Sequence, residues 1–230
     1  MTHLAGKFIV FDGAEGCGKS TQARLLADRL AREGGGGGKL GGGRWPEAVL
    51  VRDPGTTRIG EQVRAILLNP ANDEMAMRCE MLLYMAARAQ MMAERIGPAL
   101  AQGKLVLSDR FVSSTLAYQL GGDGLAAAEI RAVADAATRG RWPDLTIVLD
   151  MPARASMGRV QPKFSASPDD PGAGLEKDRI ERRPIEYHER VRQNYLAQAE
   201  ADPQRYRVVR ADRPPEQVHA DVWRLLEGMA

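Results

Sequence analysis

Residues 13–20 read G-A-E-G-C-G-K-S, a spacing of glycines, lysine and serine that is typical of a phosphate-binding loop. Glycines at these positions allow backbone N–H groups to turn inward around phosphate oxygens. Lys19 would reach the β- and γ-phosphates of a nucleotide, and the Ser20 hydroxyl would bind Mg²⁺. The alternative is a glycine-rich turn with a chance lysine. We predict that a nucleoside triphosphate and its Mg²⁺ bind to the loop residues Gly13, Ala14, Glu15, Gly16, Cys17, Gly18, Lys19, Ser20 and Thr21.

A second charged pair follows the apolar run at 105–107, where the sequence continues Ser108-Asp109-Arg110. Ligands of open parallel sheets bind at the carboxyl ends of the strands. An aspartate there suits Mg²⁺ or its water, and an arginine can bind a phosphate bidentately. The alternative is a surface ion pair or a helix cap. We favour Asp109 as a metal ligand and Arg110 as a phosphate ligand.

Arginines also follow other predicted strands and helices, at Arg52 and Arg88. Together with Arg110 they predict a second anion-binding site, which faces the phosphate-binding loop. Two facing anion-binding sites and a mobile loop form the layout of a phosphoryl-transfer kinase. Such an enzyme positions the two substrates and neutralises the charge of the transferred phosphoryl group. The Pro-, Gly- and Ser-rich segment at about 161–176 is predicted to be the lid that excludes water.

The elements that must position these residues alternate along the chain. Short apolar runs predict strands at 8–11, 48–51, 105–107, 146–149 and 206–209. Helical patterns separate them, so the predicted fold is α/β: a P-loop kinase with a five-stranded, doubly wound parallel sheet, flanking helices and a lid loop. We expect one domain over residues 1–230 and a flexible glycine-rich insertion at 34–43.

One long helix is predicted at about 74–102, interrupted near Gly97-Pro98. Its buried stripe is predicted to contain Leu82, Leu83, Ala86, Ala89 and Met92. On the preceding helix, a single face is predicted to carry Ile59, Val63, Ile66 and Leu67.

Composition excludes several classes of protein. The formal net charge of the 230 residues is +2, so no broad basic face calls for nucleic acid. No stretch approaches the ~18 apolar residues of a membrane helix, and we find no signal peptide. Two cysteines predict no disulfide framework. We therefore expect a reduced, cytoplasmic protein that binds neither nucleic acid nor membrane.

Five blocks of sequence, in order along the chain, resemble the thymidylate kinase family. They are F-D-G-A-E-G-C-G-K-S-T at 11–21, R-D-P-G-T-T at 52–57, L-L-Y-M-A-A-R at 82–88, S-D-R-F-V-S-S-T-L-A-Y-Q at 108–119 and D-R-I-E at 178–181. The resemblance implies phosphorylation of dTMP to dTDP by ATP and Mg²⁺, through direct in-line transfer, as a step of dTTP biosynthesis. It also implies a homodimer, with the 74–102 helix as a plausible interface.

The same resemblance implies roles for single residues around the phosphates. Glu15 matches the acidic loop residue near the transferred phosphoryl group and Mg²⁺, and Lys19 and Arg110 are expected to act in catalysis. Arg52 and Arg110 match arginines on the phosphate side of the monophosphate site. Asp53 takes the place of a longer glutamate in the same site.

In the base pocket, the resemblance implies that Tyr84 stacks on thymine and that Arg88 hydrogen-bonds it. Tyr118 matches the ring beneath the deoxyribose. The residues expected to line the base pocket are Ser114, Thr115 and Gln119.

The lid departs from the family pattern. Gly16 replaces an arginine, as in the bacterial type whose catalytic arginine comes from the lid. Yet the lid is long, and its cations are thinned to Arg154, Arg159 and Lys163. Arg159 is the first choice for the catalytic cation and Arg179 the second. The alternatives to a thymidylate kinase are another P-loop nucleoside monophosphate kinase and a non-catalytic, ATP-binding regulatory module.

Overall fold

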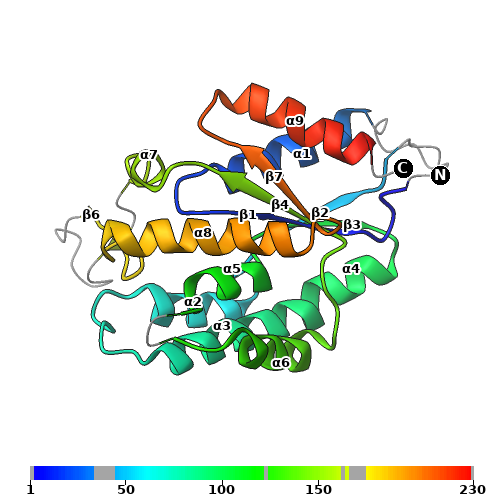
Figure 1. Ribbon diagram of the computed structural model, residues 1–230. Coiled ribbons are helices and arrows are strands. Elements are labelled where there is room, and N and C mark those ends of the chain that lie inside the picture. Colours follow the sequence, from blue (N-terminus) through cyan, green and yellow to red (C-terminus); the bar gives the residue numbers. More distant parts are fainter. Residues whose placement is uncertain (1–2, 34–44, 122–123, 162–163, 166–174, 229–230) are drawn as a thin grey trace.

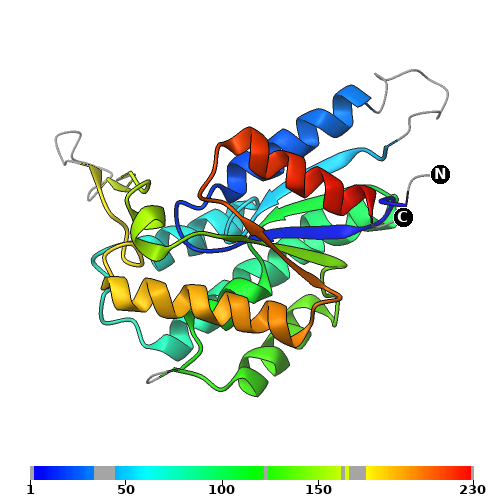
Figure 2. The same ribbon diagram turned by 45° about the horizontal axis from the view of Figure 1, so that its top comes forward.

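The computed structural model describes residues 3–33, 45–121, 124–161, 164–165 and 175–228 (Figures 1 and 2). The predicted glycine-rich insertion, Lys163 and most of the predicted lid lie outside these residues. Within the segment predicted to be the lid, two short strands pair antiparallel, β5 (Phe164–Ser165) and β6 (Leu175–Glu176). The composition of this segment predicted a loop, and the two short strands are a detail that it did not indicate; the assignment as a lid stays a prediction.

The centre of the molecule is a sheet of five parallel strands, as predicted. They are β1 (Phe8–Asp12), β2 (Ala48–Arg52), β3 (Leu105–Asp109), β4 (Leu145–Asp150) and β7 (Tyr206–Arg210). Their order across the sheet is β2-β3-β1-β4-β7. Because β1 has β3 on one side and β4 on the other, the strand order reverses at β1. A crevice at the carboxyl ends of strands is expected at such a reversal.

Helices cover both faces of the sheet, so β1 is buried along its whole length. The helices are α1 (Lys19–Glu33), α2 (Arg58–Leu68), α3 (Met77–Met91), α4 (Gly97–Ala101), α5 (Val112–Tyr118), α6 (Ala127–Thr138), α7 (Ala153–Met157), α8 (Ile185–Ala201) and α9 (Pro215–Glu227). In both views α1 and α9 lie on one face, and α3, α5, α6 and α8 lie on the other (Figures 1 and 2). Three apolar clusters fill the two sides: one between the sheet and α1 and α9, one between the sheet and α3, α5 and α6, and a smaller one among β4, α5 and α8.

Local sequence explains the helix ends. The Thr57 side chain accepts a hydrogen bond from the Gly60 backbone N–H and caps α2. Pro215 occupies the first turn of α9, where its missing N–H costs no hydrogen bond. No described helix is long and apolar enough to cross a membrane.

The helix predicted at 74–102 is divided. A π-helical turn (Met92–Ile96) separates α3 from α4, close to Gly97-Pro98. The predicted stripe is wrong: Leu82 is 49% exposed, whereas Met81 and Met85 are buried. The helix α3 carries apolar side chains of its own on most sides. The spacing of these residues therefore does not show which face packs inward.

Candidate active site

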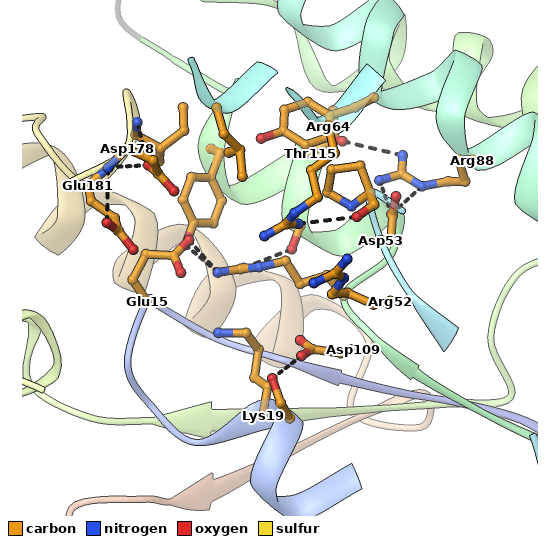
Figure 3. A pocket seen from close by; sticks show the side chains of 18 of the residues that line it. Glu15, Lys19, Arg52, Asp53, Arg64, Arg88, Asp109, Thr115, Asp178 and Glu181 are labelled. Atoms are coloured by element: carbon orange, nitrogen blue, oxygen red, sulfur yellow. Dashed lines mark hydrogen bonds and ion pairs between the residues drawn. The ribbon is translucent and has the colours of Figure 1, made fainter. Parts of the chain in front are cut away.

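A cavity of about 660 Å³ opens beside the phosphate-binding loop at the carboxyl ends of β2 and β3 (Figure 3). Lys19 and Asp109 lie at one end of it, and Arg88 and Thr115 at the other. The predicted site residues that line this cavity are Glu15, Gly16, Gly18, Lys19, Ser20, Thr21, Arg52, Asp53, Tyr84, Arg88, Asp109, Arg110, Ser114, Thr115, Tyr118 and Gln119. The fold thus brings the residues of the two predicted anion-binding sites into one cavity.

The loop between β1 and α1 requires glycine at two positions, because its backbone is packed closely against neighbouring carbonyl groups. Gly13 has φ +134°, and a Cβ there would lie 2.5 Å from the Leu149 carbonyl oxygen. A Cβ on Gly16 would clash with the carbonyl oxygen of Ser156. Lys19 Nζ donates to the Ala14 carbonyl at 2.7 Å, and Cys17 is buried behind the loop. The loop is therefore closely packed, with the Lys19 side chain folded across it.

Ser20 and Asp109 form the part of the site that fits Mg²⁺. The Ser20 hydroxyl donates to the Asp109 carboxylate, and both residues line the cavity. Their oxygens are the hard ligands that Mg²⁺ prefers, and it takes only one or two carboxylates when phosphates supply the rest. Among the described residues, no group of three or more His, Cys, Asp and Glu side chains could hold an ion alone. The donor set thus fits a metal that arrives with a nucleotide.

Arg110 occupies the middle of the cavity. Its Nη2 lies 2.5 Å from Glu15 Oε1, and its Nη1 lies 3.1 Å from the Gly13 carbonyl oxygen and 3.1 Å from Ser114 Oγ. Arg110 has φ +72°, a conformation that residues other than glycine rarely adopt. The surrounding contacts hold this backbone, so the guanidinium is fixed between the phosphate loop and α5.

Asp12, at the end of β1, binds residues next to Arg110, and the sequence analysis gave it no role. Its carboxylate is buried and accepts hydrogen bonds from Ser113, Ser114 and Tyr195. Ser114 was predicted to line the base pocket, and the structure places it in this network beside Arg110 instead of beside Arg88. Asp12 ends a buried strand directly before the loop, and that position was the available signal.

At the other end of the cavity, Arg88 is only 1% exposed. Its Nε and Nη2 lie 2.7 and 2.5 Å from a single oxygen of Asp53, Oδ2. Its Nη1 points to Thr115 Oγ1 at 3.3 Å. Asp53, predicted to bind substrate, thus holds a guanidinium that faces the cavity.

Tyr84 and Gln119 complete this end. Burial, reinforced by the nearby Glu80 carboxylate, raises the pKa of Tyr84, so its ring stays neutral. Gln119 is buried and its Nε2 donates to Glu80 Oε1 at 2.6 Å. A flat neutral ring and a fixed amide are groups that can receive a nucleobase.

Neither of the two cations predicted to reach the transferred phosphate, Arg159 and Arg179, lines the cavity. Arg159 is exposed, and its Nη1 lies 3.4 Å from the Ala211 carbonyl oxygen. Arg179 is buried and donates to Glu80 and to the Leu67 carbonyl oxygen. Its buried, paired position does not favour Arg179 as the catalytic cation. The role of Arg159 stays a prediction.

The sequence analysis gave no site role to one face of α2 or to the segment before α8, although residues 178–181 form one of the five family-like blocks. The cavity residues that it missed are Pro54, Glu61, Arg64, Ala65, Leu68, Asp178, Ile180 and Glu181. Arg64 donates to the Pro54 carbonyl at 3.1 Å, and burial together with Arg52 lowers its pKa. Positions 61, 64, 65 and 68 recur at spacings of three and four, the signal of one helix face. The predicted apolar face is buried only in part: Leu67 is fully buried, but Ile59 and Ile66 are 40% and 46% exposed.

The pKa of Glu15 predicts how pH changes stability. Burial would raise this pKa, but the charges of Arg110 and Lys19 outweigh burial and lower it to about 2. Since the unfolded pKa is about 4.3, ionised Glu15 stabilises the fold above that pH, and the contribution is lost as pH falls toward the folded pKa. We expect the free energy of unfolding of wild type minus that of Glu15→Gln to be constant from pH 8 to 6. It should shrink below about pH 5. Urea denaturation across this range measures it, and a difference that grows on acidification would contradict the assigned charge pair.

Comparison with known proteins gives consistent matches. A family model described as Thymidylate kinase matches residues 11–222. The thymidylate kinase of Desulforudis audaxviator (strain MP104C) is 42% identical over 220 residues, covering 96% of this chain and 90% of that protein. That of Pelotomaculum thermopropionicum (strain DSM 13744 / JCM 10971 / SI) is 42% identical over 224 residues, covering 97% and 94%. The crystal structure of thymidylate kinase from Ehrlichia chaffeensis matches with a TM-score of 0.72 and 30% identity, covering 97% of this chain and 99% of that one. This match confirms the predicted P-loop kinase fold.

Proposed function

Since this chain belongs to the thymidylate kinase family, we propose that it transfers the γ-phosphoryl group of ATP to dTMP, forming dTDP and ADP. The observation that carries the proposal is the single cavity that joins the phosphate-binding loop to a pocket for a base. A nucleoside triphosphate at one end and a monophosphate at the other would place their phosphates on either side of Arg110.

At the donor end, the backbone of the loop would surround the phosphates of ATP. Lys19 would move from the Ala14 carbonyl to the β- and γ-phosphate oxygens and neutralise charge as transfer proceeds. Ser20 and Asp109 would hold Mg²⁺, which would supply positive charge against the negative charge of the phosphates.

At the acceptor end, Arg110, Arg52 and Arg64 supply positive charge for the phosphate of dTMP. Arg52 is paired with Glu61 at 2.8 Å, so phosphate binding would exchange one carboxylate partner for another anion. Tyr84, Arg88 and Thr115 would hold the base. With the two phosphates fixed on opposite sides of Arg110, the acceptor oxygen can approach in line with the bond that breaks.

The product dTDP is one phosphoryl transfer away from dTTP, so we place the reaction in dTTP biosynthesis. A cytoplasmic location remains a prediction.

We also propose a homodimer that uses α2 and α3. Three of the most exposed large apolar side chains, Ile59, Ile66 and Leu82, lie on these two helices, which pack against each other. Sedimentation analysis of wild type and Leu82→Glu tests this proposal, and a wild-type monomer at high concentration would contradict it.

A nucleotide panel tests the function. Purified protein with ATP and Mg²⁺ is assayed for ADP release with dTMP, dUMP, dCMP and UMP. Turnover of dTMP above the others supports a thymidylate kinase. Preference for another monophosphate would support a different P-loop kinase, and ATP binding without turnover would support a regulatory module.

The pocket predicts the order of substrates in that panel. Arg88 only donates hydrogen bonds, so it suits the O4 acceptor of thymine and opposes the amino group of cytosine. The 5-methyl group adds only apolar contact, so we expect kcat/KM for dUMP to be lower than for dTMP by about 10- to 200-fold. The order should be dTMP, then dUMP, with dCMP and UMP far behind. A dCMP value above that of dUMP would contradict the assigned role of Arg88.

A further inference from the structure

Glu80 lies in the first turn of α3 and is completely buried. Three donors surround its carboxylate. Gln119 Nε2 lies 2.6 Å from Oε1, while Arg179 Nη2 and Arg183 Nη2 lie 2.5 and 2.8 Å from Oε2. Glu80 does not line the cavity, but Gln119 does. A buried carboxylate therefore stands directly behind a side chain that faces the base pocket.

The chemistry of these donors fixes which way the Gln119 amide faces. Arginine side chains have no acceptor, so Oε2 of Glu80 must accept from both Arg179 and Arg183. The remaining oxygen, Oε1, then faces Gln119 as an acceptor, which requires the NH₂ group of the amide. The amide oxygen of Gln119 is turned away from Glu80, and none of the described residues donates a hydrogen bond to it. The positive end of the α3 dipole further favours the carboxylate.

We propose that Glu80 is a positioning residue that determines base specificity by fixing the orientation of the Gln119 amide. The inference rests on the proposed function, because it takes the cavity beside Gln119 as the base pocket. With Nε2 held by Glu80, the carbonyl oxygen of Gln119 is the group presented to the bound base. Gln119 without this constraint could present either an acceptor or a donor, since the amide carries both.

The resulting pattern distinguishes thymine from cytosine at two atoms. The Gln119 oxygen is an acceptor and suits the N3–H donor of thymine. Arg88 Nη1 now donates to Met85 Sδ and Thr115 Oγ1, and it would exchange one of these partners for O4 of the base. Cytosine carries an acceptor at N3 and a donor at the 4-amino group, so both positions are mismatched. Rejection of a base by unpaired buried polar groups is far stronger than rejection by apolar shape.

The two arginines give Glu80 its own fixed position. Arg179 is anchored twice to the end of α2, by its N–H on the Leu68 carbonyl at 3.1 Å and its Nε on the Leu67 carbonyl at 3.0 Å. Arg179, in the segment after the predicted lid, is thus connected through Glu80 to the side-chain amide of Gln119, which faces the base pocket. A fixed second layer of this kind holds a binding group in one orientation.

Glu80→Gln tests the proposal, because it should invert the Gln119 amide. The carbonyl of the new glutamine must face Arg179 and Arg183, so its NH₂ faces Gln119. Gln119 must then turn its oxygen inward and present Nε2 to the base. We expect the ratio of kcat/KM for dTMP to kcat/KM for dCMP to fall by at least about tenfold, through a higher KM for dTMP. A variant that lost only stability would lower both values together and leave the ratio unchanged.

Two further variants serve as controls. Arg183→Gln removes one ion pair of Glu80 but keeps the hydrogen bond to Gln119, so the ratio should stay near the wild-type value. In a Gln119→Ala background, Glu80→Gln should change the ratio no further, because Glu80 acts through Gln119. Thermal unfolding identifies variants that are not folded at the assay temperature.

If Glu80→Gln does not fold, NMR of the wild type still decides. The side-chain NH₂ signals of Gln119, identified by their loss in Gln119→Leu, should exchange slowly with solvent both free and with dTMP. Rapid exchange, or an unchanged ratio in folded Glu80→Gln, would overturn the inference. A wild-type enzyme without preference for dTMP over dCMP would instead overturn the proposed function.

Discussion

Lys19→Ala should lower kcat on the order of a thousandfold while leaving the fold intact. The ammonium group is 2.7 Å from the Ala14 carbonyl and lies at the phosphate end of the cavity. Its positive charge is needed most when negative charge redistributes on the transferring phosphoryl group, so kcat should fall more than substrate affinity. The measurement is steady-state ADP release with dTMP, together with circular dichroism and thermal unfolding.

Lys7→Ala is the matched control for Lys19→Ala. Lys7 is also a lysine near β1, but it pairs with Asp144 at 3.2 Å and does not line the cavity. Its removal should leave kcat unchanged. A folded Lys19→Ala protein with near-normal kcat would show that the loop does not hold the transferring phosphate.

Arg110→Ala should weaken dTMP far more than ATP, by about 2–5 kcal/mol in kcat/KM for dTMP. Arg110 donates from both Nη atoms and sits between the phosphate loop and α5, where an acceptor phosphate would replace part of its present contacts. Losing this fork also removes the charge that most lowers the pKa of the partly buried Glu15, so this pKa should rise although Lys19 and Tyr118 remain beside the carboxylate. The activity of the variant should therefore decline at a higher pH on the acid side than that of the wild type.

Two variants separate this effect from backbone strain. Arg139 also has a positive φ, +55° at the end of α6, but it is exposed and outside the cavity. Arg139→Ala should leave both KM values unchanged. Arg110→Lys keeps the charge and should recover part of the activity. An equal rise in KM for ATP and dTMP in Arg110→Ala would place Arg110 at the donor site instead.

The phosphate loop and the sheet could be predicted because both depend on local sequence. The glycines of 13–20 fix the loop within eight positions, and the three central strands β1, β3 and β4 are short apolar runs buried on both faces. Residues at the ends of such strands, such as Asp109 and Arg110, meet at one edge of the sheet. The positions of these residues at the ends of predicted strands were therefore enough to predict that most of the site lies in one place.

Helix faces could be predicted less well. In α2 the cavity face contains Arg64, while the apolar spacing selected Ile59 and Ile66, which remain exposed. In α3 the apolar residues are so numerous that the inward face depends on which neighbours pack against it. Periodicity measures the amphipathic character of a helix, and it carries little information about a helix that is apolar on most sides or borders a polar cavity.

The sequence by itself determined the fold class, the phosphate loop and the types of residue at the site. Only the tertiary structure decided how those residues are held: Arg110 pairs with Glu15 across 95 positions of the chain, and Glu80 with Arg179 across 99. Such pairs leave no periodic signal, since their partners meet only when the sheet and helices assemble. The orientation of each buried polar group follows from these distant partners, because an unpaired donor or acceptor in the interior is costly.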